Sequence, residues 1–112
     1  MSFDKTPKGD VLEILRNVES SQSQNSLAND LGYSVGKVNY VLKALVSKGF
    51  VKIENFVNSK NKKAYRYLLT PDGLEEKISL TKAFIEIKRT EFERLQTELE
   101  VDMTRGKDNW KY

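Results

Sequence analysis

Side chains that donate hydrogen bonds or carry positive charge gather in two short stretches of the chain. The first stretch, residues 35–45, combines apolar positions with four such side chains, namely Lys37, Asn39, Tyr40 and Lys43. The second, residues 58–63, has the sequence NSKNKK, with three ammonium groups, no acid and nothing apolar. Ammonium, amide and hydroxyl donors bind anions and hydrogen-bond acceptors. The two stretches therefore indicate recognition chemistry.

The composition removes most of the usual means of catalysis and metal binding. The chain has no histidine and no cysteine. It therefore lacks the commonest metal ligand, the usual general base near neutral pH, and any thiolate site or disulfide bond. A carboxylate-based enzyme is still compatible with this composition, but no pattern indicates one. We expect no enzymatic activity, no catalytic residue, no metal and no cofactor.

Positive charge is concentrated in one third of the chain. Between Ser34 and Arg66, eight lysines and arginines stand against the single acid Glu54, a net charge of +7. Residues 71–112 carry eight basic and ten acidic residues, a net charge of −2. This asymmetry is typical of a surface that meets a polyanion.

The length of 112 residues fits one small domain with at most one extra element. No apolar run is long enough to span a bilayer, and the first ten residues do not resemble a signal peptide. We therefore expect a cytoplasmic protein with no membrane partner.

Three helices are predicted in the first half of the chain. They run from Pro7, after a cap at Thr6, to about Glu19, from a cap at Ser23 to Gly32, and from a cap at Ser34 to Gly49. Apolar residues recur at helical spacing in each of them. The inward set comprises Leu27, Ala28 and Leu31 in the second helix, and Val35, Val38, Val41, Leu42, Leu45 and Val46 in the third.

The pattern then changes to alternation. Two antiparallel strands are predicted in residues 50–56 and 64–70, with NSKNKK at the hairpin tip. A cap and turn signal follows at Thr70 to Gly73. Residues from about 74 to 103 contain no glycine or proline and indicate one helix, roughly 45 Å long, before a mobile tail.

This order of elements is that of a winged helix-turn-helix. Ala28 allows two helices to approach closely, Gly32 suits a left-handed turn, and Val38 can be buried under the corner. The expected fold class is mainly α, an α+β winged helix: a three-helix helix-turn-helix core, a two-stranded β-hairpin wing and a long C-terminal dimerisation helix. We expect a DNA-binding domain in residues 1–70 and the dimerisation helix and tail in residues 71–112.

The outer face of the third helix carries donors and no acid: Gly36, Lys37, Asn39, Tyr40, Lys43 and Ser47. A helix fits the DNA major groove, where Asn pairs with adenine and Lys donates to guanine. The lysines of the hairpin tip can reach phosphates or the minor groove. Double-stranded DNA is thus the expected partner, and the expected contacts are Ser23, Ser34, Gly36, Lys37, Asn39, Tyr40, Lys43, Lys60, Lys62, Lys63 and Arg66.

Two segments, SVGKVNYVLKALVSKGFVKIENF and NSKNKKAYRYLLTPDG, resemble the short MarR-type winged-helix regulators associated with bacterial exopolysaccharide gene clusters. The resemblance covers roughly residues 8–100. It implies a dimeric cytoplasmic transcription factor whose recognition helix is 35–48 and whose wing is 57–63. The chain is short and has one long C-terminal helix where larger MarR proteins pair several. Larger members place an effector pocket between their dimerisation and DNA-binding parts, and the resemblance does not carry that pocket over to this chain, whose small-molecule effector is unknown.

The predicted long helix carries a narrow apolar seam, formed by Ile78, Ile85, Phe92, Leu95 and Leu99. Four of these residues recur every seven positions, as in a coiled coil. The C-terminal part of the seam has nothing left in the chain to cover it, so we predict a homodimer. The alternative is a helix folded back on its own domain, with which Thr81 and Lys88 at seam positions are compatible.

Other functions compete with the DNA-binding interpretation. An RNA-binding winged helix would use aromatic stacking, for which Tyr65 and Tyr67 are available. A protein-interaction winged helix would leave the +7 segment unexplained. The basic hexamer taken alone would favour a solvated hairpin tip, and only its place in the whole pattern favours contact with DNA. The sequence gives neither the operator nor the sign of regulation.

Overall fold

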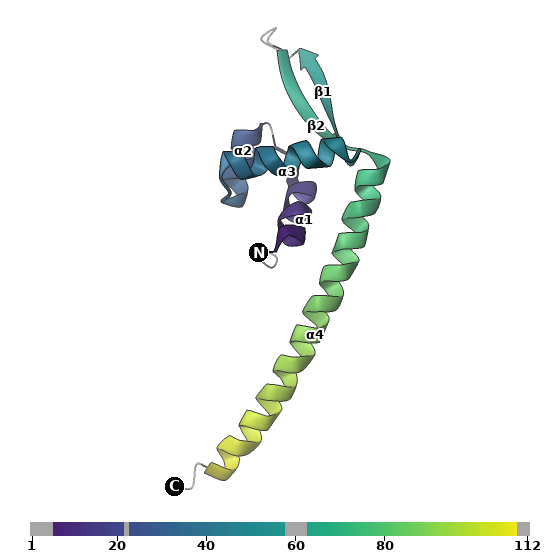
Figure 1. Ribbon diagram of the computed structural model, residues 1–112. Coiled ribbons are helices and arrows are strands. Elements are labelled where there is room, and N and C mark those ends of the chain that lie inside the picture. The colour runs from purple at the N-terminus through teal and green to yellow at the C-terminus, as the bar shows by residue number, and fades with distance from the viewer. Residues whose placement is uncertain (1–5, 22, 58–62, 110–112) are drawn as a thin grey trace. The chain divides into compact units, whose positions relative to one another are not determined.

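The computed structural model of the protein describes residues 6–21, 23–57 and 63–109. Within these ranges the elements are α1 (Pro7–Asn17), α2 (Gln24–Leu31), α3 (Val35–Ser47), β1 (Val51–Val57), β2 (Lys63–Leu69) and α4 (Pro71–Asn109) (Figure 1). The chain forms two compact units, Met1–Thr81 and Lys82–Tyr112. The first is called the winged-helix unit below. The predicted fold class, helices with a two-stranded antiparallel hairpin and a long C-terminal helix, is confirmed.

The first three helices begin at the caps predicted from the sequence. The side-chain oxygens of Thr6, Ser23 and Ser34 each accept a hydrogen bond from the backbone N–H three residues on, at 3.0–3.1 Å. These bonds satisfy donors that the first turn of a helix leaves without a helical partner. Gly32 closes α2 with a φ of 70°, the left-handed conformation predicted for the turn.

The core of the winged-helix unit is built from α1, α2, α3 and the start of β1. Its most buried apolar residues, at most 3% exposed, are Leu12, Ile14, Leu15, Val18, Leu27, Ala28, Val38, Leu42, Leu45 and Val51. Val35 was predicted to face inward but is 46% exposed. It lies in the first turn of α3, and side chains there point back toward the helix N-terminus. In this fold that direction leads to solvent.

The hairpin pairs β1 with β2 in antiparallel register, from Val51 opposite Leu69 to Val57 opposite Lys63. These bounds differ by one residue from the predicted strands. Figure 1 shows the hairpin extending from the three helices of the unit. Among the hairpin side chains that the structure describes, those near the base reach the core, whereas Ile53 is 49% and Tyr65 65% exposed. Most of the basic hexamer, residues 58–62, lies outside the described residues.

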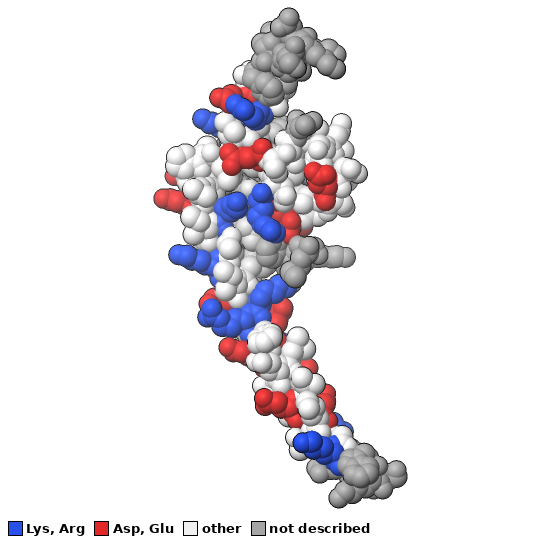
Figure 2. Space-filling view, turned by 180° about the vertical axis from the view of Figure 1, so that it is seen from behind, with Lys and Arg blue, Asp and Glu red and all other residues white. Residues whose placement is uncertain are grey.

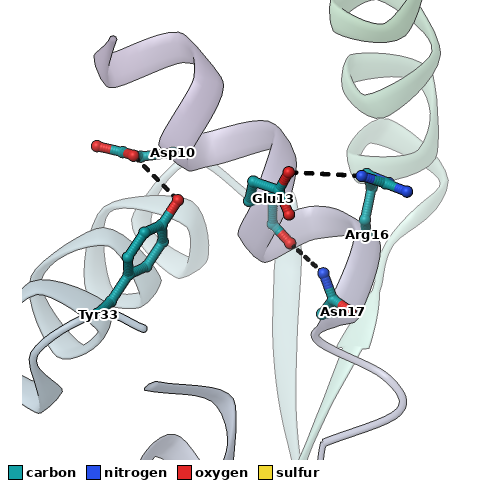
Figure 3. Close-up of polar contacts among 5 residues, drawn as sticks. All are labelled: Asp10, Glu13, Arg16, Asn17 and Tyr33. Carbon is teal, nitrogen blue, oxygen red and sulfur yellow. Dashed lines mark hydrogen bonds and ion pairs between the residues drawn. The ribbon is translucent and has the colours of Figure 1, made fainter. Parts of the chain in front are cut away.

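The end of α1 differs from the prediction. The helix stops at Asn17 instead of Glu19. The Asn17 side-chain amide donates to the backbone oxygen of Glu13 at 2.7 Å (Figure 3), and the backbone N–H of Ser20 donates to the Asn17 oxygen in the turn that follows. Helix α1 thus ends two residues earlier than its sequence suggested.

Helix α4 is longer than predicted at both ends. It begins at Pro71 and continues through Gly106 to Asn109, so the first part of the tail expected to be mobile is helical. At about 1.5 Å per residue, its 39 residues correspond to roughly 58 Å of helix. No helix within the described ranges is both long and apolar enough to cross a membrane.

A joint at Thr70 connects the hairpin to α4. The Thr70 hydroxyl donates to the backbone oxygen of Gly49 and accepts from the Gly73 N–H at 3.0 Å, while its backbone N–H donates to the Phe50 oxygen at 3.1 Å. Gly73 lies so close to the Phe50 backbone that an added Cβ would overlap the Phe50 carbonyl group. The first turn of α4 is therefore fixed against the start of β1.

Candidate nucleic-acid interface

Helix α3 presents most of the predicted outer face to solvent. Gly36, Lys37 and Lys43 are exposed, Tyr40 is 77% exposed, and Asn39 is half-buried. The helix contains no acidic residue. The structure thus brings five of the expected contacts together on one surface, with Ser34 at its N-terminal cap.

Lys37 is held by two residues of other segments. Its ammonium group lies 2.9 Å from Oδ2 of Asp10 in α1 and 4.1 Å from the centre of the Tyr33 ring. The Tyr33 hydroxyl donates to the other Asp10 oxygen at 3.0 Å (Figure 3). We call these three residues the Asp10 cluster. It ties the exposed cation nearest the start of α3 to α1 and to the turn before α3.

The Asp10 cluster changes the acidity of its phenol. Burial raises the pKa of Tyr33 to about 12, and the hydrogen bond to Asp10 and the nearby carboxylates of Asp10 and Glu13 act in the same direction. The phenol therefore stays protonated, and can donate to Asp10, throughout the physiological range.

A second contact joins α2, α3 and the hairpin. Nε2 of Gln24, the first residue of α2, donates to Oδ1 of Asn39 at 3.3 Å and to the hydroxyl of Tyr67 in β2 at 2.9 Å. We call this arrangement the Gln24 bridge. It places Asn39, the amide predicted to contact bases, beside the base of the hairpin.

The remaining predicted contacts lie around the hairpin and α2. Ser23 is exposed at the cap of α2. Arg66 forms an ion pair of 2.6 Å with Glu54, its neighbour across the two strands. The hydrogen bond that Arg66 donates to Glu54, together with the Arg66 charge, lowers the pKa of the Glu54 carboxyl. Lys60 and Lys62 fall outside the described residues, and only the backbone of Lys63, at the start of β2, is described.

Acidic residues interrupt the basic surface that the charge count suggested. On the face drawn in Figure 2, lysines and arginines of the winged-helix unit are interspersed with aspartates and glutamates. Among the described cations counted between Ser34 and Arg66, Lys37 is paired with Asp10, an acid outside that segment, and Arg66 with Glu54, which the count of +7 already includes. The net charge of +7 therefore overstates the positive charge available to a ligand.

A groove of about 460 Å³ lies between α1, α3 and the first turns of α4, within the winged-helix unit. Its lining is largely apolar and includes Val11, Val41 and Leu80, with Lys37 and Tyr40 among the residues around it. Within the described part of the chain, no group of acidic residues is arranged to hold a metal ion.

The apolar seam of α4 is exposed along its length. Ile78 is 46%, Ile85 51%, Phe92 60%, Leu95 63% and Leu99 58% exposed. Single exposed apolar residues are common, but a series repeated every seven residues on one helix is typical of a surface that pairs with another helix.

Sequence reasoning missed the residues that hold the interface in place: Asp10, Gln24, Tyr33 and Tyr67. The partners of Gln24 lie 15 and 43 residues further along the chain. No local pattern predicts such pairs. The one available signal was the position of Gln24 directly after the Ser23 cap, in the turn of α2 that begins the helix-turn-helix.

Comparisons with known proteins agree with this geometry. Residues 8–52 match the family described as winged helix-turn-helix DNA-binding. No curated protein is similar enough in sequence to count as a relative. Among solved structures, a PadR-like transcriptional regulator from Bacillus cereus is similar with a TM-score of 0.67 and 21% identity, over 78% of this chain and 93% of that chain.

Regulators from Staphylococcus aureus are also similar. MepR, described as a transcription regulator of the multidrug efflux pump MepA, has a TM-score of 0.57 and 20% identity over 96% of this chain and 81% of its own. A MepR–DNA complex has a TM-score of 0.60 and 19% identity over 92% of this chain and 76% of its own. Residues 8–52 thus match a winged helix-turn-helix DNA-binding domain, and the chain shares its fold with a PadR-like regulator and with MepR.

Proposed function

We propose that the protein is a sequence-specific regulator of transcription that binds double-stranded DNA. The recognition helix, 35–48, enters the major groove, and the wing, 57–63, lies on the backbone or in the adjacent minor groove. The observation that carries this proposal is the exposed, acid-free face of α3, where Lys37, Asn39 and Tyr40 are presented by a winged-helix fold. Amide and ammonium donors on a helix of this kind match the base edges of the major groove.

The proposal includes a homodimer formed through α4. The seam from Ile78 to Leu99 exposes five large apolar side chains at coiled-coil spacing, and a second copy of the chain is the simplest surface that would cover it. A two-fold dimer would present two recognition helices, so the operator should be an inverted repeat. The expected spacing between half-site centres is about 34–36 Å or a multiple of it.

The genes regulated are a further part of the proposal. The sequence resemblance to short MarR-type regulators points to bacterial exopolysaccharide genes, and this part rests on the resemblance alone.

Selection of binding sites from random duplexes tests the DNA-binding proposal. We expect an enriched inverted repeat, and we expect Asn39→Ala and Lys37→Ala each to weaken the enriched site by about 1–3 kcal/mol with a much smaller effect on random DNA. Equal losses on both DNAs would contradict base recognition by these residues. Structured RNA of equal length serves as competitor, because preferential RNA binding would favour the RNA-binding alternative. Retention of neither nucleic acid at low salt would favour a protein-interaction module.

A further inference from the structure

The Gln24 bridge concerns a residue that does not lie on the recognition helix. Gln24 is half-buried and is the first residue of α2. Its single amide nitrogen donates to Asn39 in α3 at 3.3 Å and to Tyr67 in β2 at 2.9 Å. An amide NH2 group has two hydrogens. Both donors of Gln24 are therefore used within the winged-helix unit, one toward the recognition helix and one toward the hairpin.

This bridge determines which end of the Asn39 amide is available to a ligand. An asparagine amide has an acceptor oxygen at one end and a two-hydrogen donor at the other. The Asn39 oxygen receives the hydrogen bond from Gln24, and no hydrogen bond from its Nδ2 is found among the described residues. The terminal torsion of an asparagine is otherwise broad, so a free Asn39 could turn either end toward a base.

We propose that Gln24 is a positioning residue for base recognition: by holding Oδ1 of Asn39 it turns the Nδ2 donor toward DNA, and through Tyr67 it links this orientation to the hairpin. This inference rests on the proposed DNA-binding function. Asn39 so oriented prefers base edges that offer acceptors in the major groove, namely guanine N7 and O6, adenine N7 and thymine O4. Gln24 itself contacts no base; it acts through Asn39.

Three substitutions of the bridge separate positioning from general stability. Gln24→Ala removes both hydrogen bonds, and Tyr67→Phe removes one of them while keeping the ring. Gln24→Glu keeps the length of the side chain but can only accept, so Asn39 must turn its Nδ2 inward and present its oxygen to DNA. Asn29→Ala is the matched control, because Asn29 is an exposed amide on the same helix with no side-chain hydrogen bond among the described residues.

Base preference, determined by selection from random duplexes with each variant, is the decisive measurement. Asn39→Ala identifies the base pair that Asn39 recognises. At that base pair, Gln24→Ala should reduce the ratio of preferred to other bases by at least about fivefold, and adding Gln24→Ala to Asn39→Ala should reduce this ratio no further. Tyr67→Phe should reduce the same base preference by a smaller factor. Gln24→Glu should shift the preference at that position toward adenine or cytosine, whose amino groups are donors. Asn29→Ala should show the same base preference as the wild type.

Several outcomes would overturn this inference. If the wild type selects a site but Gln24→Ala changes affinity equally on all sequences, Gln24 has only a structural role. The same conclusion follows if Asn39→Ala leaves the profile unchanged. Either result leaves the proposed function intact. If the wild type shows no preference among duplexes, both the positioning role and sequence-specific DNA binding are wrong. Thermal unfolding of every variant confirms that the compared proteins are folded.

Discussion

The ammonium group of Lys37 lies 2.9 Å from the carboxylate of Asp10, although the two residues belong to different helices. Lys37 was expected to face DNA, and it does lie on the exposed face of α3, but an internal carboxylate already neutralises it. A DNA phosphate that approaches Lys37 must either displace Asp10 from the ammonium group or share the ammonium group with it. Asp10 therefore influences affinity without touching DNA.

Replacing Asp10 tests this competition. Asp10→Asn frees the Lys37 charge for phosphate, so we expect tighter binding to random duplex DNA and a slope of log affinity against log salt that is steeper by up to about 1. Affinity would be titrated at four or more salt concentrations. Asp30→Asn is the control, because Asp30 is an exposed acid of α2 with no ion pair among the described residues. Equal effects of the two variants would mean that only net charge matters.

The acidity of Tyr33 offers a second test of the Asp10 cluster. Burial and Asp10 raise the pKa of Tyr33 to about 12, so the folded state holds the phenol proton more tightly than the unfolded state. The stability that this contributes is fully present below about pH 10, the ordinary tyrosine value, and is lost as the pH rises through about 12. Spectrophotometric titration of phenolate should show a late ionisation that belongs to Tyr33, and Asp10→Asn should lower the pKa of Tyr33. A titration identical to that of the wild type would contradict the assigned hydrogen bond.

Gly36 gives a test of close approach between α3 and DNA. An added Cβ would meet no protein atom within 4 Å, so Gly36→Ala should fold normally and gain up to about 1 kcal/mol of stability. If the backbone of α3 comes close to DNA, the same change should weaken DNA binding by about tenfold, or about 1.4 kcal/mol. Gly106→Ala is the control, because it is also helical and open to solvent. Unchanged affinity in Gly36→Ala would show that glycine is not needed for binding.

The seam of α4 gives a test of assembly. Phe92→Lys together with Leu95→Lys should yield monomers, because two buried charges would face each other across a paired seam. Thr90→Lys with Thr97→Lys adds the same charges at exposed positions away from the seam and should leave the assembly unchanged. Sedimentation at about 10 μM, where a stable dimer should persist, gives the mass of each. A monomeric wild type would contradict the proposed dimer.

The basic hexamer of the hairpin tip can be tested by charge removal. Lys60→Ala, Lys62→Ala and Lys63→Ala combined should reduce the salt slope of DNA binding by up to roughly 3 per protomer while leaving base preference nearly unchanged. Folding stability should move by about 0.5 kcal/mol or less, as for most surface substitutions. Superimposable slopes for the wild type and the triple variant would mean that the loop is only a solvated tip.

Local signals in the sequence correctly predicted where the first three helices begin and where the chain turns between α2 and α3. Ser23 and Ser34 cap their helices and Gly32 turns left-handed because each of these features depends on only three or four neighbouring residues. The start of α4 was missed although Thr70-Pro71 repeats the Thr6-Pro7 signal used for α1. Gly73 was taken as part of a turn, whereas its real role is to fit against the Phe50 backbone.

The contacts that refine the candidate interface could not be predicted in this way. Lys37 was correctly placed on the outer face of α3 from helical periodicity. Its pairing with Asp10, and the bridge from Gln24 to Asn39, depend on how separate elements pack together. Periodicity gives the direction of a side chain from its own helix, but it does not identify the residue that another helix brings beside it.

The joint at Thr70 has a consequence for how such a domain can change. Thr70 donates hydrogen bonds to the segment between α3 and β1 and accepts one from the first turn of α4, and Val51 anchors the hairpin base in the core. Farther out, Ile53 and Tyr65 are largely exposed. The outer hairpin is therefore an exchangeable part: its length and charge can be altered, by evolution or by grafting, without redesign of the helices that support it.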